Sequence, residues 1–574
     1  MSIYDKSSLV LIPSGTKTGK VFSQKPVSGD GDFTFTRASA ATRVNADGNI
    51  EKETSNLLLQ SNSFSTGSWS RGSSTITTGQ SGYDGTNDAT LLSATGGFSR
   101  IFQDITSFNG VFTASAYVKA GTGSWINFRI QGSNNNQIYF DIANGVLGSV
   151  FAVDLIDTSI VNVGNGWYRV AVTLNMPSVS QYNIYIADAN GSLSTTNENI
   201  YIQDFQVNQG LVAQPYQETT TAAVYGGITD NTPRLDYTDS SCPALLLEPQ
   251  RSNLLSQSEY YATTPYSRVN ASVTHNDLLS PEGVVNSAKL ESNSNGSASR
   301  IETFPTLADN TIYTASIFAK QGDVDYIMVN LRDKNNDQHN TYFDLSDGTK
   351  GSSNGSPIDS SIEAVGDYYR VTLTINSSSG GTTPRLQYLI ANTDNNVVTA
   401  SGEYIHIYGA QLEAGSYPTS YIPTYVSSVS RVADAMNAIV PQLTNSGYTA
   451  TMYVEFDGPL DPSATDAFRW YPNGDVLTRF WIYTAAAGIA GGGAFGFNKN
   501  NPKHKFIFRV SDSTTRSIFY NGTKVVNTTG VTAGNGYDQI EIFDANANRG
   551  FNFSKMIGFN QALTDQEAID LTTI

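Results

Sequence analysis

The sequence predicts an all-β protein made of tandem antiparallel β-sandwiches, of the jelly-roll kind, joined by short connecting segments. The composition is typical of short strands and polar turns, because only 15% of the 574 residues are charged while 50 are Gly and 11% are aromatic. Several segments alternate apolar and polar residues with period two. One long pattern also occurs twice. A chain of this length predicts about three or four domains.

The repeat joins segments that lie about 200 residues apart, which indicates duplicated domains and not a solenoid of small units. "FTASAYVKAG" from Phe112 returns as "YTASIFAKQG" from Tyr313, and Ser99-Arg100-Ile101 returns as Ser299-Arg300-Ile301. The closing segment "DFQVNQGLVAQPYQET" returns as "GAQLEAGSYPTSYIPT". We therefore expect two copies of one sandwich, each finished by the same strand.

Strict alternation within each copy predicts one core face and one solvent face. In "WINFRI" we expect Ile126, Phe128 and Ile130 to point inward and Trp125, Asn127 and Arg129 outward. In "GWYRVAVTL" the same reasoning places the following residues inward: Tyr168, Val170, Val172 and Leu174. It places Trp167, Arg169 and Thr173 outward.

A third sandwich is predicted over residues 441–574 by further alternating segments such as "KFIFRV" and "DQIEIFD". Asn521-Gly522 is typical of a type I′ hairpin turn. Thr564 followed three residues later by Glu567 predicts a capping box that opens one short helix. The predicted division is an N-terminal arm over 1–54, jelly rolls over 55–220 and 252–425, linkers over 221–251 and 426–440, and the third sandwich over 441–574.

The linkers carry a family resemblance. "FTRASAATRVNADGNIE" from Phe35 and "NTPRLDYTDSSCPALLLEPQRSNLL" from Asn231 resemble linking segments of structural proteins of tailed bacteriophages. There such segments precede jelly rolls similar to carbohydrate-binding modules that end in "GAQLE…PTSYIPT". The segments "YNGTKVV" and "GFNQALTDQEAIDL" resemble concanavalin A-like or laminin G-like sandwiches. The resemblance implies an external virion protein, a tail or head fibre or similar appendage, whose N-terminal arm docks on the particle.

Charge and cysteine content exclude several classes of protein. A formal charge of −17 argues against a nucleic-acid partner. No stretch resembles an apolar membrane span or a signal-peptide core, so we expect a soluble chain made without a Sec signal and not inserted in a membrane. The single cysteine, Cys242, precedes an apolar run, which favours a buried, inert thiol over a nucleophile.

No catalytic set is apparent, and we expect no enzymatic activity. The four histidines, His275, His339, His406 and His504, show no metal-ligand spacing. Asp141 and Asp344 take equivalent positions in separate copies, so they cannot form the carboxylate pair of a glycosidase. "DKNNDQ" from Asp333 has Gln338 where a calcium loop needs Gly, which favours a polar hairpin. We predict no cofactor, although the resembled jelly rolls often hold a structural calcium ion.

The outward faces offer a set of aromatic, amide and charged side chains that suits sugar recognition. The same side chains also suit packing against a sister subunit or a neighbouring domain, and the sequence favours packing. In the first copy they are Trp125, Asn127, Arg129, Tyr139, Asp141, Trp167 and Arg169. In the second copy they are Tyr326, Asn330, Tyr342, Asp344 and Arg370.

These features lead to three functional hypotheses. The first is a virion appendage that binds host-surface glycans, the second a connector or decoration protein that binds only other virion proteins, and the third a polysaccharide depolymerase. We expect a homo-oligomer, with a trimer favoured. Virion docking is predicted for the N-terminal arm through Lys6, Lys17, Lys20 and Lys25, a local excess of positive charge. Deleting residues 1–50 is then expected to leave all three sandwiches folded.

Overall fold

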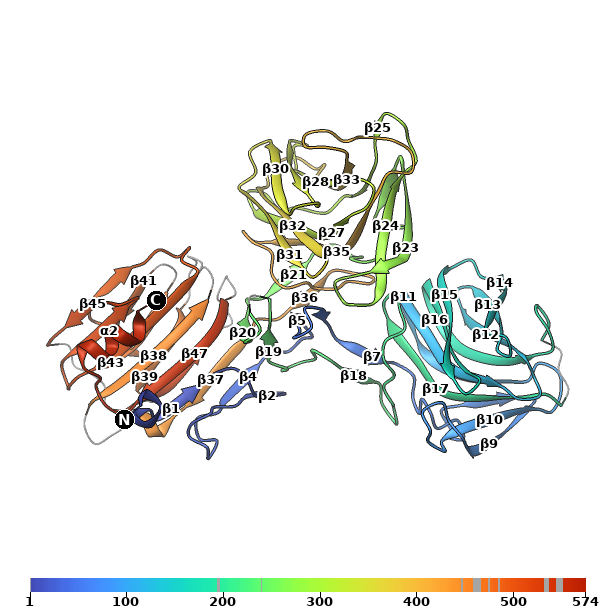
Figure 1. Cartoon of the computed structure of the whole chain (residues 1–574), viewed down its shortest axis with the longest axis horizontal. Helices are drawn as coiled ribbons and strands as arrows, with labels where there is room; N and C mark the ends of the chain where they lie inside the picture. The colour runs from blue at the N-terminus through green and yellow to red at the C-terminus, as the bar shows by residue number, and fades with distance from the viewer. Residues whose placement is uncertain are drawn as a thin grey trace.

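The computed structural model describes residues 2–193, 197–238, 240–444, 448–457, 466–472, 475–483, 486–530, 536–542 and 551–573. The all-β prediction is confirmed, since antiparallel sheets make up the three lobes that surround a central junction (Figure 1). The helices of the described residues are α1 (Ile3–Lys6), α2 (Asp565–Thr572) and the short 3-10 turns η1 (Pro441–Leu443) and η2 (Val476–Thr478). None of them is long and apolar enough to cross a membrane.

The first jelly roll is the lobe that carries β8 to β17 in Figure 1. Its strands are β8 (Ser70–Gly72), β9 (Ser74–Gln80), β10 (Ala89–Ala94), β11 (Arg100–Ala120), β12 (Trp125–Gly132), β13 (Asn135–Asp141), β14 (Val146–Phe151), β15 (Leu155–Gly164), β16 (Trp167–Ala187) and β17 (Asn199–Gln209). As predicted, Ile126, Phe128 and Ile130 point into its core.

Two long strands give this jelly roll its two layers. The first part of β11 pairs with β8 and with the second part of β16, and that part of β16 pairs with β12. The second part of β11 pairs with β17 and with the first part of β16, which pairs with β15. The register of the β11–β16 pair shifts where the parts join, so the two strands pass from one layer into the other.

The second jelly roll repeats this pairing with the long strands divided. One layer has the order β22 (Ser267–Val269), β26 (Arg300–Thr303), β33 (Arg385–Ala391), β28 (Tyr326–Arg332), β29 (Gln338–Asp344) and β30 (Thr349–Asn354). The other has the order β23 (Ala271–Leu279), β24 (Val285–Ser292), β35 (Tyr404–Ala414), β27 (Ile312–Gln321), β32 (Tyr368–Asn376) and β31 (Asp359–Val365). A short pair, β25 (Ser297–Ala298) and β34 (Val398–Thr399), closes one end.

The third lobe, the base sandwich, is assembled from separate parts of the chain. One sheet holds β1 (Leu9–Leu11), β19 (Arg234–Asp236), β20 (Ala244–Leu247), β38 (Ala450–Asp457), β43 (Lys503–Val510), β44 (Arg516–Tyr520), β45 (Thr523–Thr528) and β47 (Phe551–Phe559). The other holds β2 (Thr16–Lys17), β3 (Lys20–Val21), β4 (Phe33–Thr36), β37 (Ala435–Ile439), β39 (Asp466–Pro472), β40 (Phe480–Tyr483), β41 (Ala486–Ile489), β42 (Ala494–Gly496) and β46 (Tyr537–Ile542).

This assembly corrects the prediction of an independent N-terminal arm. Strand β1 pairs with β47 and β4 pairs with β37, so residues 9–36 belong to the sheets of the base sandwich. Leu9, Leu11 and Phe35 share one buried core with residues near the C-terminus. The arm cannot bury these apolar side chains alone, and the base sandwich provides the missing partner surface. We therefore expect deletion of residues 1–50 to remove β1 and β4 from this sandwich and to destabilise it.

The predicted linkers also take part in the base sandwich, because β19 and β20 come from the first and β37 from the second. The two jelly rolls are thus insertions between strands of one base sandwich. The chain leaves and re-enters the base through three short strand pairs at the junction: β5 (Arg43–Val44) with β6 (Ile50–Glu51), β7 (Thr54–Asn56) with β18 (Val224–Gly226), and β21 (Arg251–Asn253) with β36 (Val429–Arg431).

Two local predictions near the C-terminus are confirmed. Asn521 and Gly522 both have positive φ, 42° and 80°, as the type I′ turn between β44 and β45 requires. The Thr564 side chain accepts a hydrogen bond from the Glu567 amide while Glu567 reaches back to Thr564, which forms the capping box of α2.

Candidate functional site

The outer face of one layer of the first jelly roll holds five of the seven residues predicted there. Strand pairing sets Trp125 beside Asp141 and Asn127 beside Tyr139, with Arg129 further along β12. The second part of β16 adds Tyr185 next to Asn127, and β11 adds Arg100 next to Tyr185. We call the set of Arg100, Trp125, Asn127, Arg129, Tyr139 and Tyr185 the arginine face.

Two guanidinium groups cover the centre of the arginine face. The Arg100 and Arg129 guanidinium carbons lie 5.2 Å and 5.6 Å from the centre of the Tyr185 ring, a cation–π arrangement. Arg100 donates to the Tyr185 hydroxyl, and Arg129 donates to Asn135 Oδ1 at 2.6 Å. Among the described residues neither arginine forms an ion pair with a carboxylate.

Below these arginines lies an amide without a partner. Asn127 is completely buried, and neither polar atom of its side chain has a hydrogen-bond partner within the described part of the chain. Asn183 of β16, which pairs with Arg129 of β12, is also buried. Its Oδ1 has no hydrogen-bond partner among the described residues. Burial also raises the pKa of the neighbouring Tyr139. Unsatisfied buried amides cost free energy, so this face has capacity for polar contacts that the chain itself does not use.

The other two predicted residues of the first copy lie in the opposite layer, because β16 changes layers between them and Tyr185. Trp167 is buried, and its ring contacts Tyr83 and Tyr201, so the prediction that it points to solvent is wrong. Arg169 stacks on Tyr117 and donates to Ser115 and to the Gln214 carbonyl. The predicted outward residue Thr173 is buried too, bonded to Thr113. The closing segment covers this layer.

The same division separates the residues predicted in the second copy. Tyr326, Asn330, Tyr342 and Asp344 share the outer face of the layer that holds β28 and β29, whereas Arg370 lies on β32 in the other layer. Here a chain of hydrogen bonds links the polar groups: Asn330 donates to Gln387 at 2.8 Å, and Gln387 donates to Glu302 at 2.6 Å.

Glu302 also neutralises the arginine that the two copies share. It accepts from Arg300 at 2.8 Å, and Arg300 corresponds to Arg100 in the repeated Ser-Arg-Ile segment. At the position of Glu302, the first copy has Phe102. The second face thus has a carboxylate beside the shared arginine, and it also has Asn330 in place of Arg129 and Leu389 in place of Tyr185.

Arg100 and Tyr185 were not among the predicted site residues. The repetition of Ser-Arg-Ile in both copies was a signal for Arg100, because a charged residue kept between core residues of a strand needs a reason. Tyr185 gave no local signal, since its neighbours on β11 and β12 are brought to it only by strand pairing.

The four lysines predicted to dock on the virion have partners within the base sandwich. Lys6 forms an ion pair with Glu567, and Lys20 forms one with Asp32 at 3.3 Å. Lys25 donates to the Tyr4 carbonyl at 3.0 Å, and the Lys17 ammonium lies 5.7 Å from the centre of the Phe22 ring. The Lys6 pair ties the segment to α2, and the other three contacts lie within the N-terminal segment.

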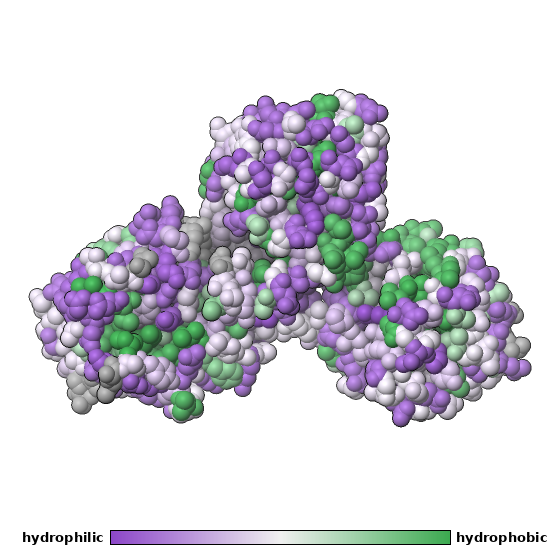
Figure 2. Space-filling view, in the orientation of Figure 1, coloured by the Kyte–Doolittle hydropathy of each residue, from purple (hydrophilic) through white to green (hydrophobic). Residues whose placement is uncertain are grey.

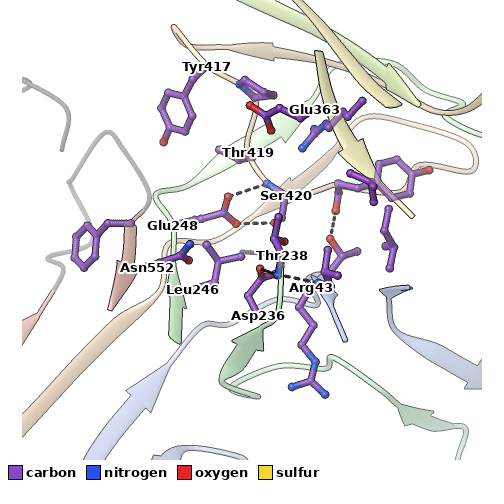
Figure 3. A pocket seen from close by; sticks show the side chains of 18 of the residues that line it. Arg43, Asp236, Thr238, Leu246, Glu248, Glu363, Tyr417, Thr419, Ser420 and Asn552 are labelled. Atoms are coloured by element: carbon purple, nitrogen blue, oxygen red, sulfur yellow. Dashed lines mark hydrogen bonds between the residues drawn. The ribbon is translucent and has the colours of Figure 1, made fainter. Parts of the chain in front are cut away.

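Charged side chains converge a second time at the central junction, where a cavity of about 330 Å³ opens between the lobes. Figure 3 shows Glu248 bonded to Ser420 in its wall, with Arg43, Asp236 and Tyr417 nearby. Behind the wall Glu248 pairs with Arg234 at 2.6 Å and with Arg431 at 2.8 Å. Burial alone would raise the pKa of Glu248, but the two arginines hold it well below its usual value.

Asp434 completes this buried network by pairing with Arg37 at 3.0 Å and with Arg234. Burial lowers the pKa of Arg37 to about 10, although Asp434 opposes that effect. Arg37, Arg234 and Arg431 come from three different connecting segments, and the carboxylates between them already have partners at every oxygen. The network therefore holds the connecting segments together.

The remaining sequence candidates have local roles. Burial lowers the pKa of His275 to about 3 and that of His504 to about 4, and His406 bonds Asp277 at 2.9 Å. His339 lies on β29. Cys242 is exposed, so the prediction of a buried thiol is wrong.

The aspartates considered in the sequence analysis stabilise turns by accepting backbone hydrogen bonds. Asp333 accepts the amides of Asn335 and Asp337 at 2.9 Å each, which gives the expected polar hairpin. Asp141 and Asp344 accept amides of their own turns, from Ala143 and Ser346. No group of three His, Cys, Asp or Glu residues in the described ranges is placed to hold a metal ion.

Comparison with known proteins identifies no family. No family model matches the chain, and no curated protein sequence matches it. Among solved structures, the chain is similar to the Trypanosoma rangeli sialidase at 10% sequence identity over 94% of this chain and 98% of that one. The TM-score of 0.19 is too low to support any conclusion about fold or function.

Proposed function

We propose that this chain is a non-enzymatic structural protein on the outside of a tailed-phage virion, and that it contributes to host attachment by binding an acidic glycan on the arginine face. The resemblance of the linkers and closing segments to phage structural proteins supports the virion setting. One observation carries the binding role: Arg100 and Arg129 have no carboxylate partner among the described residues, and both guanidinium groups lie over the Tyr185 ring on one face.

The chemistry of the face favours a sugar with a carboxylate, such as a uronate. Guanidinium groups bind carboxylates through charge-assisted hydrogen bonds, and a preformed face loses little entropy when the ligand binds. The half-buried Trp125 offers an apolar surface to a pyranose ring. In the second jelly roll Glu302 supplies the negative charge internally, so that face is the weaker candidate.

A glycan array probed with the full chain tests the proposal. We expect binding to uronate-bearing glycans and not to neutral ones, weakened by salt because the attraction is electrostatic. The double substitution Arg100→Ala and Arg129→Ala should lower the affinity at least tenfold, as expected for hydrogen bonds to charged groups worth roughly 1.5–3 kcal/mol each.

The second jelly roll provides a control, in which Arg300 corresponds to Arg100 and Arg332 lies on the same face. Replacing Arg300 and Arg332 by Ala there should leave glycan affinity unchanged, because those arginines lie on the face that Glu302 neutralises. Binding to neutral glycans alone, no binding to any glycan, or equal losses for both variants would overturn the assignment.

A connector or decoration role is the second candidate, in which the lobes contact only other virion proteins. It is favoured by the apolar edge of the first jelly roll described below, since exposed apolar surface suits protein contacts more than sugar contacts. Cross-linking on intact particles would reveal protein neighbours of this edge. The non-enzymatic part of the proposal is tested separately, because release of reducing ends from host polysaccharide would contradict it.

A further inference from the structure

The first jelly roll exposes a group of apolar side chains along one edge, which we call the apolar edge. They come from the outermost strand of one layer, β14, from the turn that follows and from β15: Val146, Leu147, Val150, Phe151, Val153 and Val161. Their exposed fractions range from 37% for Val150 to 82% for Val153. Figure 2 shows hydrophobic surface gathered over the part of this lobe where β14 and β15 lie in Figure 1.

The fold does not require these residues, because the second jelly roll builds the same edge from polar ones. Strand β30 corresponds to β14, and it reads Thr349-Lys350-Gly351-Ser352-Ser353-Asn354. In the other layer of the first jelly roll, Val161 of β15 pairs with Arg169. In the second jelly roll the corresponding residue is Glu363 of β31, which pairs with Arg370. Two copies of one sandwich thus differ at this edge in polarity and not in pairing. The apolar residues of the first copy therefore call for a partner.

A bulge in β14 gives the edge two apolar sides. Leu147 and Val150 lie opposite Phe140 and Ile138 of the core, so they point toward the interior side of the layer. Val146 and Phe151 point to the outer side, where the Phe151 ring contacts Tyr139. The Ser149 amide at the bulge already donates to Asn190 at 2.6 Å. Contact with a partner must therefore depend on side chains more than on a continuous backbone ladder.

We propose that the apolar edge is a self-association surface, on which β14 meets β14 of a second copy across a two-fold axis. Antiparallel pairing centred between Gly148 and Ser149 sets Val146 against Phe151 and Leu147 against Val150 of the other copy. The small residues Gly148 and Ser149 face each other at the centre. Apolar side chains of one copy therefore contact apolar side chains of the other, and the small residues contact each other. A two-fold interface requires this kind of self-complementarity.

Charge also favours a second copy at this place. Two chains of formal charge −17 repel each other, and residues 146–153 contain no charged side chain. The six side chains would bury on the order of 1,000 Å² of surface counting both copies, near the lower limit of a specific interface. The inference does not depend on glycan binding, and it replaces the expected trimer by a dimer.

Light scattering of the full chain over a range of micromolar concentrations tests the inference. We expect the mass to rise from 61.8 kDa toward twice that value. Grafting the second jelly roll's residues as Leu147→Lys, Val150→Ser and Phe151→Asn should keep the protein monomeric with an unchanged circular-dichroism spectrum, because the second jelly roll folds with these residues at the same edge. Leu477→Lys, at a 77% exposed apolar residue of the base sandwich, is the control that should still dimerise.

Cysteine cross-linking tests the register, in a Cys242→Ser background that removes the single native thiol. A Leu147→Cys chain mixed with a Val150→Cys chain should form a heterodimeric disulfide in higher yield than either chain alone. A monomer at all concentrations, a trimeric mass, or a dimer unaffected by the graft would overturn the inference. Loss of virion assembly by the graft, with a wild type that is monomeric in solution, would assign the edge to another protein.

Discussion

Asp204 shows how a single position can depart from its copy in the repeat. It lies at a bulge of β17 with a φ of 54°, where the second jelly roll has Gly409 with a φ of 62°. Its carboxylate is buried and accepts a hydrogen bond from the Tyr83 hydroxyl at 2.9 Å. Burial, with smaller contributions from Asp88 and Asp84, raises the pKa of Asp204 to about 7, although the hydrogen bond from Tyr83 opposes this shift.

This carboxyl predicts a pH dependence of the first jelly roll. A folded pKa above the unfolded value means that the folded state binds more protons between about pH 4 and 7, so stability should fall as the pH rises through that window. Asp204→Asn keeps an acceptor for Tyr83, tolerates the positive φ and carries no charge. We expect it to remove this slope and to stabilise the jelly roll by roughly 2–4 kcal/mol at pH 8. Calorimetric unfolding at several pH values measures both effects.

The control for this prediction is Asp84→Asn in the same loop. Asp84 is exposed; burial alone would raise its pKa, but hydrogen bonds from Thr86 and Gln203 together lower it. Its contribution to stability is present above pH 4 and is lost as the pH falls, so its replacement should keep most of the slope between pH 4 and 7, reduced only by the small effect of Asp84 on the pKa of Asp204. A slope that persists in Asp204→Asn would show that another group titrates.

Strand β4 illustrates what an element gains from a distant partner. Its residues Phe33 and Phe35 alternate with exposed threonines, as a half-buried strand requires, yet the sheet that covers them comes from the other end of the chain. Phe35 is buried against Met436 and its neighbours in the base core. The N-terminal segment is therefore a structural part of the base sandwich.

We expect Phe35→Ala to destabilise the base sandwich by about 3–5 kcal/mol, the usual cost of removing a buried aromatic ring. The two jelly rolls should keep their own unfolding transitions, because their cores are separate. Phe22→Ala, at a partly exposed ring of the same segment, should cost less than about 1 kcal/mol. Urea unfolding followed by tryptophan fluorescence gives the comparison, since Trp470 lies in the base core. Equal effects of the two substitutions would contradict this assignment of the segment.

The three lobes of the whole molecule meet at one buried network of three arginines and two carboxylates. Arg37 enters from the segment before the first jelly roll, Arg234 from the segment between the jelly rolls, and Arg431 from the segment after the second. Ion pairs of this kind contribute little net stability, but loss of one partner leaves charges buried without compensation. The network therefore fixes how the lobes are connected.

Asp434→Ala should cost about 3–5 kcal/mol, because Arg37 and Arg234 would lose their shared carboxylate in a buried site. We expect faster hydrogen exchange at the amides of β19 and β36 and a broader distribution of sizes in solution scattering. Glu51→Ala removes the half-exposed Arg43–Glu51 pair at the same junction and should change neither measurement. Unchanged exchange in the Asp434 variant would mean that backbone pairing alone holds the junction.

The sequence by itself determined the features that depend on neighbours along the chain. Period-two alternation fixed which side of β12 faces the core, the Asn-Gly pair fixed a hairpin, and Thr564 with Glu567 fixed the start of a helix. The repeat revealed two copies of one sandwich, because duplicated segments keep the same spacing of apolar residues.

Only the tertiary structure decided which strands share a layer and which segments share a core. A strand such as β16 changes layers along its length, so Trp167 and Tyr185 lie on opposite faces although both follow the same alternation. The N-terminal strands find their partners at the other end of the chain, where Phe35 meets Met436. Local patterns specify the direction of a side chain, whereas the identity of its neighbours depends on pairing between strands that are distant in sequence.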